Sequence, residues 1–137
     1  MTNTPIYWNK AKNHLSKKDK VMKILIKRYN DTTLSTRKDI FYSLCKSIIG
    51  QQISVAAADS VFKKFSNSCK GKITPKSVRK LGLIKLKKCG LSKMKAIGIK
   101  SLSEKLLNKS FNPNLIKTMS DEEAITYLSS LRQIGRW

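Results

Sequence analysis

Acidic residues are scarce in this sequence, which has 8 Asp and Glu against 29 Lys and Arg among its 137 residues. The resulting formal net charge of +21 favours a polyanionic partner, because each phosphate that a protein neutralises releases counterions and strengthens binding. A lysine-rich proteome produces the same composition without any contact to nucleic acid. The charge alone therefore leaves both interpretations open.

Histidine, cysteine and long apolar runs are also scarce or absent. The single histidine, His14, cannot build a His-based zinc site or a Ser-His-Asp triad. Cys45, Cys69 and Cys89 lie far apart without a Cys-x-x-Cys pair, so we interpret them as reduced thiols of a cytoplasmic protein. No run approaches the roughly 18–20 apolar residues of a membrane span, and the start is unlike a signal peptide. We expect no cofactor and no membrane partner.

Sustained strand alternation is absent, whereas signals for helix starts recur along the chain. Apolar residues between these signals follow a helical period, for example at Ile40, Leu44 and Ile48. The pattern predicts an all-α fold, with a single domain over residues 1–137 built as a bundle of about seven or eight short helices. The predicted helix starts are Thr4-Pro5, Ser16 with Asp19, Thr36, Ser54, Thr74-Pro75, Ser92, and Ser120 with Glu123.

A polar turn, Ile49-Gly50-Gln51-Gln52-Ile53-Ser54, separates two strongly apolar predicted helices. A glycine at position 50 permits backbone geometry that other residues resist. The turn is either a helix–helix corner with solvated amides or a loop that presses into a nucleic-acid groove. In the second case one glutamine acts as a wedge or as a reader of base edges.

A second unusual segment closes the chain, from Leu131 to Trp137. A helix that ends in a tight hydrophobic-Gly turn exposes backbone N–H groups, which hold a phosphate without sequence preference. Arg136 adds charge at that turn, and an exposed Trp137 is costly unless it packs or stacks on a base. Taken alone, the seven residues are better explained as a frayed C-terminal end.

Together these segments resemble the helix–hairpin–helix (HhH-GPD) base-excision DNA glycosylases, in particular the DNA-3-methyladenine glycosylase II type. The resemblance spans most of the chain and implies monofunctional hydrolysis of the N-glycosidic bond of alkylated purines. The implied partner is double-stranded DNA with alkylated bases, bound by a monomer associated with the bacterial nucleoid. The motifs that carry the resemblance, in the family's order, are Asp39 to Ser54, Ala56-Ala57-Ala58, Gly90-Leu91-Ser92 with Lys95-Ala96, Met119 to Glu123, and Ile134 to Trp137.

The resemblance implies that the Gly50–Ser54 loop enters the minor groove of damaged DNA. Gln52 occupies the position whose side chain fills the gap left by an extruded nucleotide, and its neighbours Gln51 and Ser54 are expected to contact DNA. Flipping a base leaves unstacked neighbours, worth a few kcal/mol, that an inserted group must support.

The resemblance also implies that the segment Leu131 to Arg136 forms a hairpin that grips the DNA backbone beside the lesion. The family's hairpin usually begins with glycine where this chain has Gln133, so we expect a slightly altered backbone there. The carbonyls of Leu131 and Ile134 are candidate ligands for an alkali cation, and no other metal is implied. The expected DNA-binding residues of the hairpin are Gln133, Ile134, Gly135 and Arg136.

Trp137 stands where lyase-type members of the superfamily carry a catalytic lysine. An aromatic residue there implies a wall of the base pocket, which favours a positively charged alkylated purine by stacking and cation–π attraction. We expect Trp137 and the glutamine pair to face one cleft.

The family's catalytic Asp lies about twenty residues beyond the position of Trp137, so no catalytic residue is expected in this chain. Asp121, Glu122 and Glu123 are better explained as first-turn charges of the last helix. We therefore expect an incomplete domain that lacks the second hairpin helix and the C-terminal helices, exposes apolar surface on its first helices and does not release bases alone.

Two other functions fit the sequence less well. A non-catalytic helix–hairpin–helix module would bind DNA through charge and hairpin amides with little preference for damaged sites. A small basic RNA- or ribosome-associated protein is compatible with the net charge, but the ordered motifs do not favour it.

Overall fold

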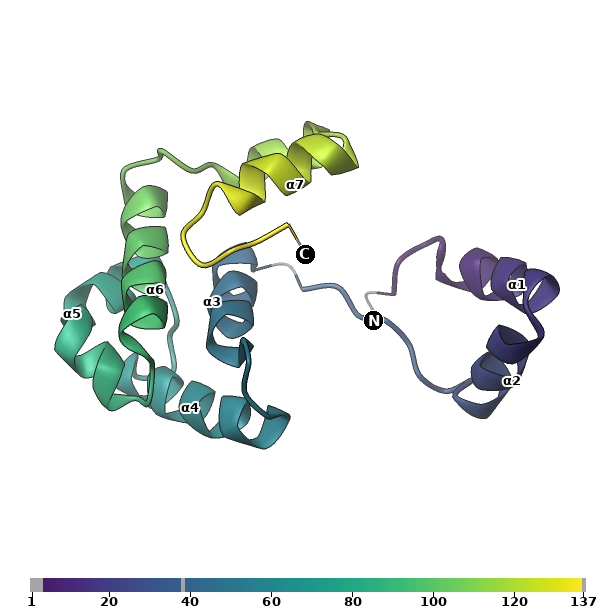
Figure 1. Cartoon of the computed structure of the whole chain (residues 1–137). Coiled ribbons are helices and arrows are strands. Elements are labelled where there is room, and N and C mark those ends of the chain that lie inside the picture. The colour runs from purple at the N-terminus through teal and green to yellow at the C-terminus, as the bar shows by residue number, and fades with distance from the viewer. Residues whose placement is uncertain (1–3, 38, 137) are drawn as a thin grey trace. The chain divides into compact units, whose positions relative to one another are not determined.

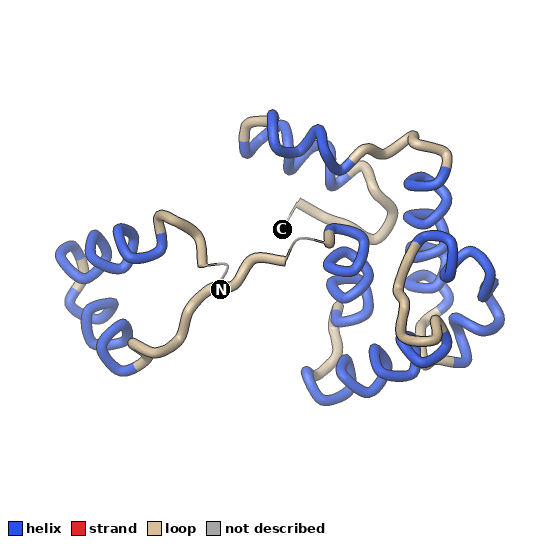
Figure 2. Tube along the Cα trace, turned by 180° about the vertical axis from the view of Figure 1, so that it is seen from behind, coloured by secondary structure: helices blue, strands red, loops and turns tan. Residues whose placement is uncertain are grey.

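The computed structural model describes residues 4–37 and 39–136, and all regular structure within these ranges is helical (Figures 1 and 2). Seven α-helices and one 3₁₀-helix lie in the described ranges, which confirms the all-α prediction. Packing divides the chain into two compact units, Met1–Lys38 and Asp39–Trp137. The single-domain assignment stays a prediction, and each unit is described separately below.

The first unit is a helix pair, α1 (Trp8–Lys18) and α2 (Lys20–Arg28). Asp19 caps α2, as predicted, by accepting a hydrogen bond from the Met22 N–H at 2.9 Å. Two predicted starts are wrong. Ser16 lies inside α1, and α1 begins only after a turn in which the Trp8 N–H donates to the Pro5 carbonyl, so Tyr7 rather than Thr4 is the N-cap.

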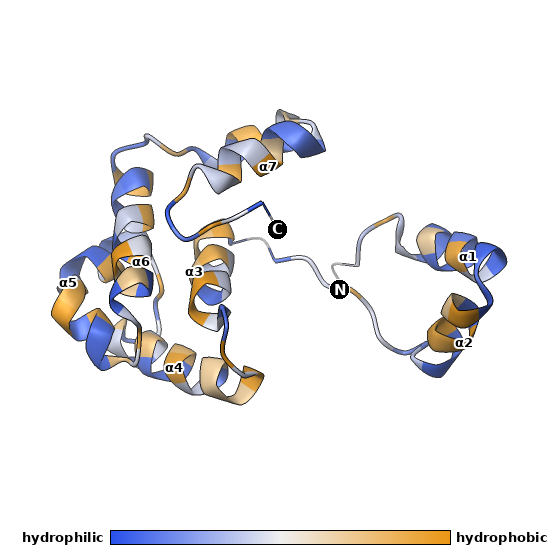
Figure 3. Cartoon of the chain, in the orientation of Figure 1, coloured by the Kyte–Doolittle hydropathy of each residue, from blue (hydrophilic) through white to orange (hydrophobic). Residues whose placement is uncertain are grey.

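Apolar side chains remain exposed on this helix pair, as expected for the first helices. Val21 and Ile24 on α2 are 64% and 66% exposed, and much of the α2 ribbon has the colour of hydrophobic residues in Figure 3. Between the two helices lies an apolar groove of about 230 Å³. The indole nitrogen of Trp8, which lines this groove, is buried and has no hydrogen-bond partner among the residues that the structure describes.

The second unit begins with α3 (Ile40–Gly50), α4 (Val55–Ser68), α5 (Pro75–Lys88) and α6 (Lys93–Leu107). The predicted start at Thr36 is wrong, because the Asp39 carboxylate caps α3 by accepting from the Tyr42 N–H at 2.9 Å. The starts predicted for α4, α5 and α6 are confirmed by side-chain caps at Ser54, Thr74 and Ser92. Helix α5 is kinked at Gly82, whose φ of +71° is a conformation that glycine adopts readily.

The core of this unit forms where α6 packs against α5 and α3, and α3 against α4. Three cysteines lie in it as free thiols, and burial raises the pKa of the Cys45 and Cys69 thiols, which keeps them protonated. The buried Ser103 hydroxyl donates to the Pro75 carbonyl at 2.6 Å. The largest fully buried apolar side chains are Phe65, Ile48, Ile49, Leu86, Ile99 and Val78.

A 3₁₀-helix, η1 (Pro113–Thr118), leads into α7 (Asp121–Ser129). The predicted capping box is present, since Ser120 and Glu123 exchange side-chain-to-backbone hydrogen bonds. The Tyr127 ring stacks on Phe111 with centroids 4.8 Å apart, and its hydroxyl accepts from the Asn112 N–H at 2.8 Å. These contacts hold α7 to the segment that follows α6. None of the described helices is both long and apolar enough to span a bilayer.

Candidate nucleic-acid interface

The turn after α3 connects it to α4 through the four residues Gln51–Ser54. Gln51 leaves the helix with extended backbone, Gln52 takes a left-handed φ of +55°, and the Ser54 hydroxyl caps α4 by accepting from the Ala57 N–H at 3.2 Å. The left-handed residue is therefore Gln52, whereas Gly50 is the last helical residue of α3, contrary to our expectation for the glycine. Gln52 and Ser54 are exposed at this corner.

Gln51 differs from Gln52 because its side chain faces the protein. It is half-buried, and its Nε2 donates to the Gln133 carbonyl at 2.5 Å. This hydrogen bond joins two segments that are 82 residues apart in the sequence. The loop and the hairpin, each singled out from the sequence, therefore lie next to each other.

Sequence reasoning missed the structural role of Lys95, although Lys95-Ala96 is part of the family-like pattern. The Lys95 ammonium donates to the carbonyls of Ile49 at 2.8 Å and of Gln51 at 2.7 Å. Both carbonyls lie at the C-terminal end of α3, where backbone oxygens lack helical partners and the helix dipole favours a cation. Lys95 thereby ties the start of α6 to the loop.

The hairpin after α7 is a tight turn with a buried apolar base. Leu131 is buried, its N–H donates to the Leu128 carbonyl at 3.0 Å, and the Ile134 N–H donates to the Leu131 carbonyl at 3.2 Å. Gln133, at the position where the family usually has glycine, takes a left-handed φ of +66°. The chain thus keeps a backbone conformation that glycine favours, without the glycine.

Gly98 on α6 provides the space that this hairpin needs. A Cβ at Gly98 would lie 2.7 Å from Gln133 Cγ and 3.4 Å from the Arg132 carbonyl oxygen. Only a residue without a side chain lets the hairpin approach α6 this closely. The hairpin is therefore positioned by α6 on one side and by Gln51 on the other.

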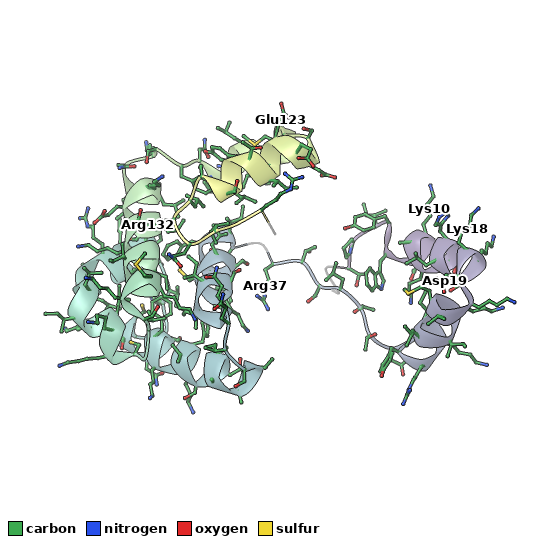
Figure 4. All side chains as sticks on the ribbon, in the orientation of Figure 1. Lys10, Lys18, Asp19, Arg37, Glu123 and Arg132 are labelled. Atoms are coloured by element: carbon green, nitrogen blue, oxygen red, sulfur yellow. The ribbon has the colours of Figure 1, made fainter. Side chains whose placement is uncertain are left out.

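Arg136, predicted to contact DNA, makes an ion pair within the protein. Its Nη2 lies 2.8 and 2.9 Å from the two carboxylate oxygens of Glu122. Asp121, Glu122 and Glu123 form the first turn of α7, as predicted, and hydrogen bonds from the Ser120 backbone and hydroxyl lower the pKa of Glu123. Figure 4 shows Glu123 on this helix and Arg132 in the hairpin.

A cleft of about 320 Å³ lies between α3, α7 and the hairpin. Trp137, the predicted wall of the base pocket, lies outside the described residues. The alkali-cation site on the Leu131 and Ile134 carbonyls stays a prediction, and the described residues contain no cluster of three His, Cys, Asp or Glu able to hold a metal. The residues that line the cleft are Leu44, Ser47, Gln51, Ile125, Leu128, Ile134, Gly135 and Arg136.

The family model for HhH-GPD superfamily base excision DNA repair proteins matches residues 45–135. The chain belongs to this superfamily. The matched range contains the loop after α3, Lys95 and the hairpin up to Gly135. The family resemblance predicted from the sequence is thereby confirmed.

Two relatives from Schizosaccharomyces pombe place the chain within the superfamily. It is 30% identical over 136 residues to the alkylbase DNA glycosidase-like protein mag2, covering 95% of this chain and 64% of that protein. It is 30% identical over 139 residues to DNA-3-methyladenine glycosylase 1, covering 93% of this chain and 59% of that protein. The chain thus spans about three fifths of the length of these superfamily members.

A solved superfamily structure shares the fold. The Schizosaccharomyces pombe 3-methyladenine DNA glycosylase Mag1, determined in complex with abasic DNA, is 29% identical and superimposes with a TM-score of 0.79. The match covers 93% of this chain and 65% of that chain.

Proposed function

We propose that this protein is a base-excision repair glycosylase that hydrolyses the N-glycosidic bond of alkylated purines of the 3-methyladenine type. The Gln51–Gln133 hydrogen bond is the observation that carries the proposal, because it joins the loop and the hairpin into one surface. The names of the relatives support the substrate class, and the abasic DNA bound to one of them supports DNA as the partner, which we propose to be double-stranded.

In this proposal Gln52 enters the DNA stack when a nucleotide is extruded. Its side chain is exposed, and it follows directly on Gln51, which is held to the hairpin. A glutamine amide can fill the gap and hydrogen-bond to base edges, which offsets the few kcal/mol that unstacking costs. The hairpin backbone would hold the phosphate next to the lesion without reading sequence.

The cleft between α3, α7 and the hairpin is our candidate for the side of the molecule that receives the extruded base. Leu44, Ile125, Leu128 and Ile134 give it largely apolar walls. Trp137 would add an electron-rich ring, which attracts a positively charged alkylated purine more strongly than an unmodified one. We further propose that the protein acts as a monomer on the nucleoid DNA of a bacterium.

The hydrolytic step requires a negative charge that stabilises an oxocarbenium-like sugar. We assign this role to none of the 8 acidic residues of the chain. Glu123 is engaged in the capping box of α7, and Glu122 is paired with Arg136. We therefore attribute DNA binding to Gln52, the hairpin and the cleft. The hydrolysis is proposed for the protein without assigning it to a residue of this chain.

The deciding test compares the affinity of the 137-residue chain for a duplex with a central tetrahydrofuran abasic analogue and for the same duplex without it. We expect at least about tenfold tighter binding to the abasic duplex, because no base has to be unstacked and extruded at the abasic site. Gln52→Ala should remove most of this preference. Asn67→Ala, which deletes an exposed amide on α4, is the matched control and should leave it unchanged.

Two outcomes separate the alternatives. Equal affinity for both duplexes, unaffected by Gln52→Ala, would reject the proposal and favour a non-catalytic DNA-binding module. Release of free 3-methyladenine from methylated duplex by the whole protein tests the hydrolytic part. Abasic preference without any such release would favour a module that recognises damage but leaves its removal to another enzyme.

A further inference from the structure

We propose that Lys95 is a positioning residue for damage recognition, which holds the Gln51–Gln52 peptide in the orientation that presents Gln52 to DNA. This inference rests on the proposed role of Gln52 as the group that enters the stack. It assigns to one lysine a function distinct from the general attraction of cations to phosphate.

The burial of Lys95 and the partners of its ammonium group together set it apart from the other cations of its region. Residues 60–103 contain twelve lysines, one arginine and no acidic residue. Of these thirteen cations only Lys95 and Lys100 are half-buried, and the others are exposed. Lys100 lies 3.9 Å from the Glu104 carboxylate, whereas Lys95 donates to backbone carbonyls.

The two carbonyls that Lys95 contacts determine the direction of the loop. The Gln51 carbonyl and the Gln52 N–H belong to the same planar peptide unit, so fixing the oxygen fixes one side of the Gln52 φ angle. That angle is +55°, a left-handed conformation that is uncommon and energetically costly for a residue other than glycine, so contacts that stabilise it matter. The bonds of 2.7 and 2.8 Å from a charged donor are of the strong kind that can impose it.

The loop is therefore held from two sides. Lys95 fixes its backbone oxygens, and the Gln51 side chain fixes it to the Gln133 carbonyl. Without Lys95, the Gln52 peptide can rotate to a more favourable φ and the side chain leaves its position at the corner. Insertion of Gln52 into DNA would then require the loop to be ordered again on binding, which lowers affinity for the damaged site only.

The experiment measures the ratio of affinities for the abasic and intact duplexes in the 137-residue chain. We expect Lys95→Met to lower this ratio about tenfold, as for the loss of a charge-assisted hydrogen bond. Lys95→Arg should retain most of the affinity ratio of the unmodified chain, because a guanidinium can reach both carbonyls. Lys93→Met removes the same charge from an exposed position on the same helix and should weaken both affinities equally, leaving the ratio unchanged.

A double variant links the effect to Gln52. Because Lys95 acts through Gln52, Lys95→Met with Gln52→Ala should have the ratio of Gln52→Ala alone. An unchanged ratio in Lys95→Met, or additive effects in the double variant, would overturn the inference while the effect of Gln52→Ala upheld the proposed function. A Gln52→Ala variant without effect would overturn both.

Thermal unfolding of each variant separates positioning from loss of the fold. If Lys95→Met does not fold, the same comparison is made with Lys95→Gln, which keeps a neutral donor group on a stem half as long. Lys95→Gln should lower the ratio less than tenfold but measurably, and a ratio equal to that of the unmodified chain would reject the positioning role.

Discussion

Gln133 and Gly98 show how single residues position the hairpin. The left-handed φ of Gln133 costs a residue with a Cβ of the order of 1 kcal/mol or more, so its surroundings must maintain it. Part of that support is the contact with α6, where the absence of a side chain at Gly98 leaves room for Gln133 Cγ. The two positions are therefore expected to be energetically coupled.

Substitution of Gly98 tests this coupling. We expect Gly98→Ala to lower the free energy of unfolding by about 1–3 kcal/mol, because the new Cβ lies 2.7 Å from Gln133 Cγ. Gln133→Gly alone should change it by less than about 1 kcal/mol, since relief of strain is offset by the more flexible unfolded chain. Combined with Gly98→Ala, it should recover at least half of the loss, because the colliding atoms are gone. Urea unfolding of the four proteins measures these energies.

Gly50→Ala is the control for this cycle. A Cβ at Gly50 meets only Ala58 Cβ at 3.9 Å, an ordinary contact. The residue is helical, so alanine should leave the protein equally stable or stabilise it by up to about 1 kcal/mol. If the variant with both Gly98→Ala and Gln133→Gly loses as much stability as the two single variants together, the Gly98–Gln133 contact does not support the hairpin.

At the scale of helices, local signals predict the elements better than their boundaries. Ser54, Thr74, Ser92 and Ser120 are identifiable because a capping residue there follows a loop and precedes an apolar period. Ser16 is misleading because serine is also tolerated within a helix. Where a predicted start is wrong and a side-chain cap exists, the cap is an aspartate closer to the helix that follows, Asp19 for α2 and Asp39 for α3.

The contacts between elements could not be predicted from the sequence. The loop and the hairpin are identifiable from motif order, but the Gln51–Gln133 bond joins residues 82 positions apart. The bonds of Lys95 likewise span 44 and 46 positions, and in the sequence this lysine is one of many. Which lysine is half-buried depends on how α6 packs against α3, and periodicity does not specify packing order.

The ion pair between the hairpin end and the start of α7 is expected to compete with DNA for Arg136. Arg136 and Glu122 are 69% and 72% exposed, so their pairing contributes little to stability. Glu122→Gln should leave the free energy of unfolding within about 0.5 kcal/mol of the original. It should strengthen binding to an intact duplex about two- to fivefold at low salt, because Arg136 is released and one negative charge is removed. Fluorescence anisotropy at two salt concentrations measures the effect.

Glu104→Gln is the matched control for Glu122→Gln. It removes the same charge from an exposed carboxylate on α6, paired with Lys100 at 3.9 Å. A smaller increase in affinity than for Glu122→Gln is expected. Equal increases would show that the Arg136–Glu122 pair does not compete with DNA and that only net charge matters.

At the scale of the whole molecule, the cations are unevenly distributed along the chain. The acid-free stretch 60–103 covers most of α4, all of α5 and most of α6, which belong to the same unit as the loop and the hairpin. A cleft of about 490 Å³ between α4 and α5 is lined by Lys64, Lys85 and Lys88. If this unit meets the DNA backbone, these lysines should contribute more to binding than lysines elsewhere.

The salt dependence of DNA binding decides between this interpretation and simple lysine-rich composition. Replacing Lys64, Lys85 and Lys88 by Gln should reduce the slope of log affinity against log salt by up to about 0.9 for each phosphate that is no longer neutralised. Replacing three of the α1 lysines, Lys10, Lys17 and Lys18, changes the net charge equally and should alter the slope much less. The abasic preference should survive both changes, because phosphate contacts position a protein without reading the lesion. Equal slopes in the two triple variants would mean that the excess of lysine reflects composition, and that DNA is recognised by the loop and hairpin alone.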